Sequence, residues 1–271
     1  MTHRTLRSLR KTIAIAPLLL LPLMAQAHRS FLVPSSTVLS QTANQWVSVD
    51  AARGNDLFFF NHNALPLEGL QIISPSGKAT DPAKLERFRY KAVFEWQLTE
   101  PGTWRAAVVN DGLRVQWQEN GQAKRWNGPD ADFALHVPAT AEKLSVNQVA
   151  SRVETFVTMG KPSAVTPTGK GLELRFATHP NDLAASETAT LTFLQDGKPA
   201  PQLKVSIIAG GARWHESTQQ IDGVTDDNGS IQVRWPSAGL YWINASTRVA
   251  ATVAQAKQKS LTYAATLEVL P

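Results

Sequence analysis

The stretch AVFEWQLTEPGTWRAAVV, residues 92–109, decides the fold class. Residues 92–98 and 103–109 both alternate apolar side chains with other residues, which is the period of a half-buried β-strand. The Glu-Pro-Gly sequence at 100–102 supplies residue types that favour a turn. We therefore expect two β-strands joined as a hairpin.

The same pattern of short strands and turn signals repeats outward from this stretch. Turns such as Asn-Gly and Asp-Gly separate the candidate strands, and no segment shows a sustained helical period. Six or more candidate strands after residue 170 favour an immunoglobulin-like sandwich, although its Cys-Trp-Cys signature is absent. We predict an all-β fold of two β-sandwich domains, the C-terminal one immunoglobulin-like. The candidate strands are residues 45–50, 70–74, 113–118, 172–177, 188–195, 203–208, 230–235, 241–247 and 261–270.

Prolines and polar residues set the expected domain boundaries. An N-terminal β domain is predicted over residues 28–140 and the C-terminal sandwich over 171–271. Between them we expect a linker over 141–170, because Pro138, Pro162 and Pro167 disfavour a continuous core element. Residues 152–158 are one candidate strand within this linker.

Residues 1–27 have the organisation of a cleavable secretory signal peptide. Four basic residues precede an apolar run, and Ala25-Gln26-Ala27 offers the small side chains that a signal peptidase requires. The apolar run is too short to span a bilayer. We expect cleavage before His28, a periplasmic location, and no membrane span after processing.

The composition excludes some classes of protein. Removing residues 1–27 takes away four basic residues and lowers the net charge from +5 to +1, so the sequence indicates no nucleic-acid partner. The chain has no cysteine, so no disulfide framework supports an exported fold. With few methionines as well, it lacks the soft sulfur ligands that a Cu(I) carrier uses.

Several motifs in order along the chain resemble a known periplasmic family. They are residues 151–160, 171–183, 195–199, 225–229 and 238–242, together with a mature start at His28 followed by an aromatic residue and Pro34. These segments look like DUF4198, a family of unknown function whose members are often labelled cobalt or nickel uptake components and are NikM-like. The resemblance implies metal handling beside an outer-membrane or inner-membrane uptake component.

Three histidines are candidate metal ligands. A mature N-terminal His28 can chelate an ion through its α-amine and its Nδ1 atom, which suits Ni, Co or Cu in the divalent state. His62 follows an apolar run at a loop, and His179 is held extended at a strand end by Pro180. We therefore predict a transition-metal site at His28, His62 and His179. The alternating pattern around His136 predicts a structural residue on a strand, while His215 fits either role.

The search for catalytic motifs points away from an enzyme. The sequence has no Gly-x-Ser-x-Gly elbow, no His-Glu-x-x-His pair and no phosphate-binding loop. The leading hypothesis is a non-enzymatic metal-binding or metal-uptake accessory protein. One alternative is an envelope interaction module that binds no metal, and another is a copper monooxygenase that uses an N-terminal histidine.

Overall fold

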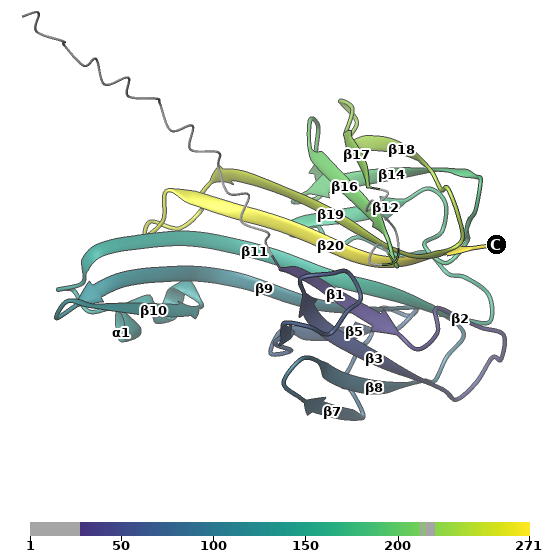
Figure 1. Cartoon of the computed structure of the whole chain (residues 1–271), viewed down its shortest axis with the longest axis horizontal. Coiled ribbons are helices and arrows are strands. Elements are labelled where there is room, and N and C mark those ends of the chain that lie inside the picture. Colours follow the sequence, from purple (N-terminus) through teal and green to yellow (C-terminus); the bar gives the residue numbers. More distant parts are fainter. Residues whose placement is uncertain (1–27, 212–213, 215–219) are drawn as a thin grey trace, which may run out of the picture.

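The computed structural model describes residues 28–211, 214 and 220–271, so the predicted signal peptide lies outside the described residues. The described chain folds almost entirely into β-strands, which form three layers (Figure 1). Its two short helices, η1 (Asp130–Asp132) and α1 (Phe133–His136), lie together at one end of the molecule. No helix in the described residues is long and apolar enough to cross a membrane.

The layers are a five-stranded sheet, a large central sheet and a four-stranded sheet. The five-stranded sheet has the order β1-β3-β8-β7, with β4 beside β3: β1 (Arg29–Pro34), β3 (Gln45–Gly54), β4 (Asn63–Ala64), β7 (Lys84–Arg87) and β8 (Ala92–Leu98). The four-stranded sheet contains β12 (Leu172–Phe176), β14 (Thr188–Gln195), β15 (Lys198–Pro199) and β18 (Ser230–Arg234).

The central sheet has the order β17-β16-β19-β20-β11-β9-β5-β6, and β2, β10 and β13 pair at its margins. Its strands are β2 (Val38–Leu39), β5 (Leu70–Ile73), β6 (Ala79–Thr80), β9 (Gly102–Glu119), β10 (Gln122–Gly128), β11 (Glu142–Met159), β13 (Leu183–Ala184), β16 (Lys204–Ala209), β17 (Ile221–Val224), β19 (Gly239–Ala250) and β20 (Gln258–Leu270). Strand β11 pairs antiparallel with β9 and parallel with β20.

Two hydrophobic cores lie on opposite faces of this central sheet. Val153 and Val157 of β11 belong to the core under the five-stranded sheet, whereas Ala150 and Phe156 belong to the core under the four-stranded sheet. This is the two-residue alternation of a strand that is buried on both faces. The all-β prediction is confirmed: the chain forms two sandwiches, the C-terminal one immunoglobulin-like, and they share one sheet.

The segment 141–170, expected to be a linker, differs from that expectation in the structure. Residues 142–159 form β11, an 18-residue strand at the centre of the central sheet. The prolines that suggested a linker flank this strand at Pro138 and Pro162 and do not interrupt it. Polar residues within β11 made it resemble a connection, and the structure shows that several of them are buried.

The stretch 92–109 forms two strands, but the hairpin prediction is wrong. Strand β8 belongs to the five-stranded sheet and β9 to the central sheet, so the turn at 100–102 carries the chain across the core. Gly102 has φ 125°, a conformation that favours glycine. The Trp104 side chain donates a hydrogen bond from Nε1 to the Glu100 carbonyl at 3.0 Å, which ties the turn to the core.

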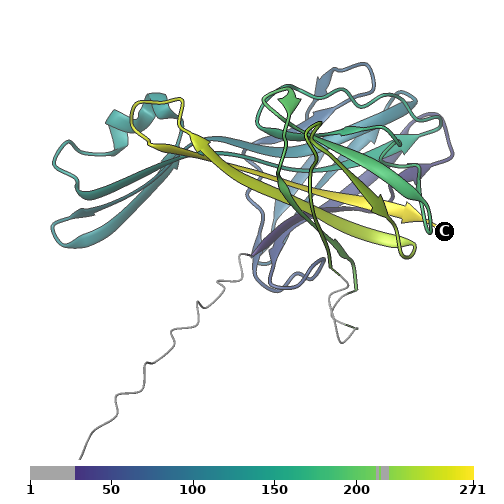
Figure 2. The ribbon, with the colours of Figure 1, turned by 90° about the horizontal axis from the view of Figure 1, so that it is seen from above.

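Strands β9, β10, β11, β19 and β20 extend beyond both cores as an arm, defined here as residues 110–148 and 250–260 (Figures 1 and 2). One face of the arm carries a small core in which Leu113, Val115 and Trp117 pack near Val137 and Phe133 of the helical segment. The register places Arg114, Arg125 and Asn147 on the opposite face. The arm therefore has one covered apolar face and one polar face.

Candidate metal centre

The His28 and His62 side chains lie directly against each other. Their imidazole rings stack with centroids 3.4 Å apart and planes at 4°. Strand β1 begins opposite Gly54 and β4 begins opposite Arg53, so both strands flank the end of β3. Two histidines that are distant along the chain are thereby placed to share one site.

The loop between β3 and β4 holds His62 through its own hydrogen bonds. The Asn55 backbone N–H donates to Asn61 Oδ1 at 2.9 Å, and Asn61 Nδ2 donates to Asp56 Oδ2 at 3.0 Å. A side chain at Gly54 would meet the Asp56 carbonyl at 2.5 Å, so the loop folds back too closely for any larger residue. The Phe58 ring packs edge-on against Phe31 in the core at 5.4 Å. These contacts fix the loop against the end of the sheet.

The surroundings of His62 favour its neutral form. Loss of hydration is the largest cause that lowers the pKa of His62, followed by the nearby charges of His28 and Arg53. A neutral imidazole has the free lone pair that metal coordination requires.

His179 lies apart from this pair. Strand β1 starts next to His28 and ends at Pro34, after which β2 pairs with Thr158 and Met159 at the far end of β11. His179 contacts that far end, with Nε2 2.9 Å from Thr103 Oγ1. A six-residue strand is about 20 Å long, so the two positions are at opposite ends of β1.

Both ring nitrogens of His179 have hydrogen-bond partners. The Asn181 backbone N–H donates to Nδ1 at 3.2 Å, which places the proton on Nε2, and Nε2 lies 3.1 Å from the Ser163 carbonyl. Asn181 in turn accepts a hydrogen bond from Thr158 at 2.9 Å. In this structure His179 joins the 163–181 segment to β9 and β11. Among the described residues, no group of three or more His, Cys, Asp or Glu side chains is placed to hold an ion.

Replacing His179 with glutamine is expected to lower the stability of the fold by about 1–3 kcal/mol, the cost of leaving buried partners unsatisfied. Burial is the largest cause that lowers the pKa of His179. As pH falls below about 6.5, the unfolded chain therefore binds a proton that the folded chain does not, and wild-type stability declines. Urea unfolding from pH 7.5 to 5 measures this slope. The variant should show a smaller slope than wild type, and an unchanged slope would contradict a lowered pKa of His179 in the folded chain.

The remaining histidines have separate environments. His136 lies at the end of α1, where its ring stacks on Trp126 with centroids 5.2 Å apart. Sequence reasoning placed it on a strand, and that placement is wrong because the chain turns helical after Pro129. His215 lies outside the described residues.

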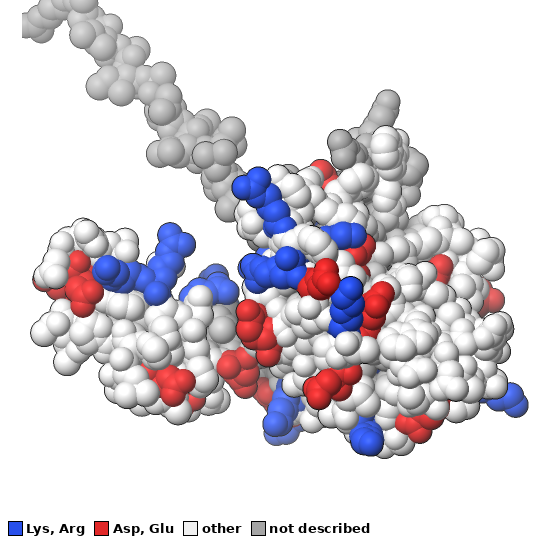
Figure 3. All heavy atoms as spheres, turned by 90° about the horizontal axis from the view of Figure 1, so that it is seen from below, with Lys and Arg blue, Asp and Glu red and all other residues white. Residues whose placement is uncertain are grey.

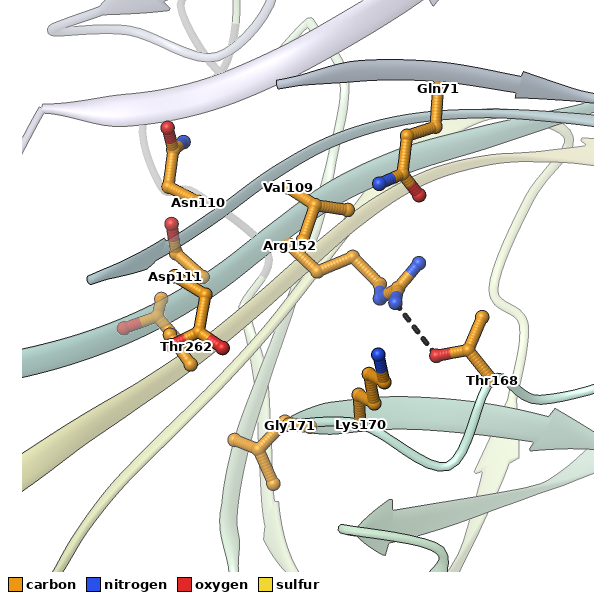
Figure 4. Close-up of a pocket in the computed structure, with 12 residues that line it drawn as sticks. Gln71, Val109, Asn110, Asp111, Arg152, Thr168, Lys170, Gly171 and Thr262 are labelled. Atoms are coloured by element: carbon orange, nitrogen blue, oxygen red, sulfur yellow. Dashed lines mark hydrogen bonds between the residues drawn. The ribbon is translucent and has the colours of Figure 1, made fainter. Parts of the chain in front are cut away.

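A polar pocket that sequence reasoning missed lies between the central sheet and residues 168–172 (Figure 4). Its volume is about 470 Å³, and Arg152, Lys170, Gln71 and Asp111 are among its lining residues. The Arg152 side chain donates from Nη2 to Thr168 Oγ1 at 3.0 Å, as Figure 4 shows. The only signal in the sequence was a pair of oppositely charged residues, Arg152 and Glu154, two positions apart in the candidate strand 152–158.

Behind this pocket, the Arg152 guanidinium lies between two buried carboxylates. Glu154 is 3.5 Å and Glu173 3.4 Å from its nitrogens, and Tyr263 donates a 2.6 Å hydrogen bond to Glu154. Burial raises the pKa of Glu154, and burial together with the Glu154 charge raises that of Tyr263. Glu173 also accepts hydrogen bonds from the backbone N–H groups of residues 168–170. Because these carboxylates already engage Arg152, we interpret the cluster as structural.

Comparison with known proteins identifies the family of the chain but not its activity. No curated protein matches. Among solved structures, the D0-D1 domain of intimin is 13% identical with a TM-score of 0.23, covering 89% of this chain and 97% of that chain. A DUF4785 family protein from Legionella pneumophila is 11% identical with a TM-score of 0.23, covering 79% of this chain and 50% of that chain.

A third solved structure, E. coli alpha-2-macroglobulin, is 11% identical with a TM-score of 0.23, and the match covers 92% of this chain and 14% of that chain. At such TM-scores, no property of these proteins is transferred to this chain. The family comparison is different in kind, because one family model matches residues 25–249. The match covers most of the 271 residues, so the chain belongs to DUF4198, a family described as a domain of unknown function.

Proposed function

We propose that this protein is an exported, periplasmic metal-binding protein that holds one divalent Ni, Co or Cu ion at His28 and His62. In this proposal it passes the ion to an uptake component of the envelope and carries out no catalysis. The observation that supports the proposal is the contact between the two imidazoles, whose ring centroids are 3.4 Å apart. The transport role follows the family resemblance.

The two rings lie close enough for one ion to reach both once the rings change orientation. Metal–nitrogen bonds of about 2.0–2.1 Å place two nitrogens on one ion about 3–4 Å apart, depending on the bond angle. The lone pairs lie in the ring planes, and these planes are parallel within 4°, so the rings must tilt toward each other to bind. His28 is exposed, which leaves its ring free to turn. A chain that begins at His28 adds its α-amine as a third nitrogen donor.

Titration of the chain that begins at His28 with Cu(II) or Ni(II), in a non-chelating buffer, tests this proposal. His28→Ala and His62→Ala should each weaken binding by at least about 100-fold, because each removes a ligand. His136→Ala is the matched control and should bind as wild type, since its ring stacks on Trp126 at the distant arm. His179→Ala should also retain binding if it folds.

The outcome of this titration also separates the alternatives. No saturable binding at micromolar metal would contradict the proposal and favour an interaction module that works without metal. Metal binding accompanied by oxidase activity, with a reductant and dioxygen present, would contradict the absence of catalysis and favour the copper monooxygenase. Equal loss of binding in His62→Ala and His136→Ala would contradict the assignment of His62.

A further inference from the structure

Three arginines from different strands lie within electrostatic range at Arg53: the charges of the other two act on it, and Arg53 in turn acts on His62. Arg53 is on β3, Arg87 is on β7 and Arg114 is on β9. Within the described part of the chain, the salt bridges involve none of these three guanidinium groups. Figure 3 shows Lys and Arg side chains, with Asp and Glu side chains among them, on both sides of the hollow between the arm and the rest of the molecule.

The strand registers explain why the three side chains converge. Side chains two residues apart on a strand lie on the same face. Arg53 therefore lies on the same face of β3 as Val47, Val49 and Ala51, which face the first core. Arg114 likewise lies on the same face of β9 as the core residues Trp104, Ala106 and Val108. Both therefore point from facing sheets into the space where the arm leaves the first sandwich.

Arg87 joins this group from the edge of the five-stranded sheet. It lines a cavity of about 230 Å³ together with Leu85, Leu67 and Glu68. The Glu68 charge raises the pKa of Arg53, whereas the charges of Arg87 and Arg114 lower it. Glu68 is thus the carboxylate that lies near both Arg53 and Arg87.

The nearby charges of this group bear on the pKa of Arg53. Burial is the largest cause that lowers its pKa, and the charges of Arg114 and Arg87 lower it further. Arg53 also acts on His62, so the arginine group and the histidine pair share one region of the surface. Three like charges with one nearby carboxylate, Glu68, leave an excess of positive charge that costs free energy, and a bound anion offsets that cost.

We propose that Arg53, Arg87 and Arg114 bind the carboxylates of a small polycarboxylate chelator that brings the metal ion to His28 and His62. Planar guanidinium groups bind carboxylates through two parallel hydrogen bonds. A divalent ion held by a tricarboxylate carries net negative charge, which suits this region. Two or three nitrogen ligands leave positions on the ion that carboxylate oxygens of the chelator can occupy.

This inference rests on the proposed metal site, and titration calorimetry with citrate as the probe tests it separately. Citrate is added without metal to the chain that begins at His28, and then to Arg53→Gln and Arg114→Gln. Each substitution should weaken citrate binding by about tenfold, the loss expected for one charge-assisted hydrogen-bonded contact. Arg234→Gln, an exposed arginine on β18 in the other sandwich, is the matched control and should bind citrate as wild type.

Two further measurements distinguish citrate binding at the arginines from metal binding at the histidines. His28→Ala should lose binding of Ni(II) alone but keep binding of citrate alone, so failure of the metal site can be told apart from failure of the anion site. Raised salt should weaken citrate binding through screening. No saturable citrate binding, equal weakening by Arg234→Gln, or inorganic phosphate binding as tightly as citrate would each overturn the proposal.

Discussion

A chain that begins at His28 is expected to bind Cu(II) or Ni(II) at least about 100-fold more tightly than the same chain with one alanine added before His28. The added residue keeps both imidazoles but converts the α-amine of His28 into an amide. A protonated amide nitrogen is a poor ligand, so the chelate ring with Nδ1 is lost. Isothermal titration of the two proteins in parallel measures the difference.

The extended chain is a sharp test because the added residue lies outside strand β1. Strand β1 begins at Arg29, so both proteins should have the same circular dichroism spectrum and unfolding midpoint. A loss of metal affinity with unchanged stability would support the terminal chelate. Equal affinity of the two proteins would exclude the α-amine as a ligand and leave only the two imidazoles.

Replacing Arg152 with alanine is expected to lower the free energy of unfolding by about 3–5 kcal/mol, the cost of removing one partner of a buried ion pair. The side chains of Arg152, Glu154 and Glu173 are 6%, 3% and 3% exposed, so the substitution leaves two buried carboxylates without their cationic partner. Urea unfolding measures the loss. Arg175→Ala, an exposed arginine on β12, is the control and should change stability little.

The pH dependence of this loss follows from Glu154. Burial raises its pKa above the ordinary value, so on raising the pH through this range the folded chain retains a proton that the unfolded chain has already released. Stability therefore falls as pH rises from the ordinary glutamate range through the raised pKa. Arg152 opposes this effect, so the deficit of Arg152→Ala should widen as pH rises. A deficit that is constant with pH would contradict the pairing with Glu154.

The fold class was predictable because strand alternation is a local signal. The period of two in residues 92–98 and 103–109 indicated strands, and both segments form them as β8 and β9. The pairing of these strands was not predictable. Whether a turn closes a hairpin or carries the chain to another sheet depends on what both strands pack against. Here the side chains of Trp96 and Trp104 are buried in the first core, between two sheets.

The candidate site was predictable in part. The residue type and chain position of His28, and the loop position of His62, were visible in the sequence, and the structure brings these two together. His179 shared the same local signals, but its ring nitrogens form hydrogen bonds with Thr103 and with the Asn181 backbone. Thr103 is far away along the chain, so no local pattern in the sequence indicated this contact. The arginine group was not predictable, because Arg53, Arg87 and Arg114 come together only through strand registers.

The parallel pairing of β11 with β20 has a consequence for the order of folding. Gln148 pairs with Lys259 and Thr155 with Thr266, so the central strand acquires its neighbour from more than a hundred residues further along the chain. The chain loses the entropy of closing this long loop before the strands gain their stabilising contacts, which slows the formation of such sheets. Strand β20 contributes Ala264 to the first core and other side chains to the second, so neither core is complete until β20 has docked.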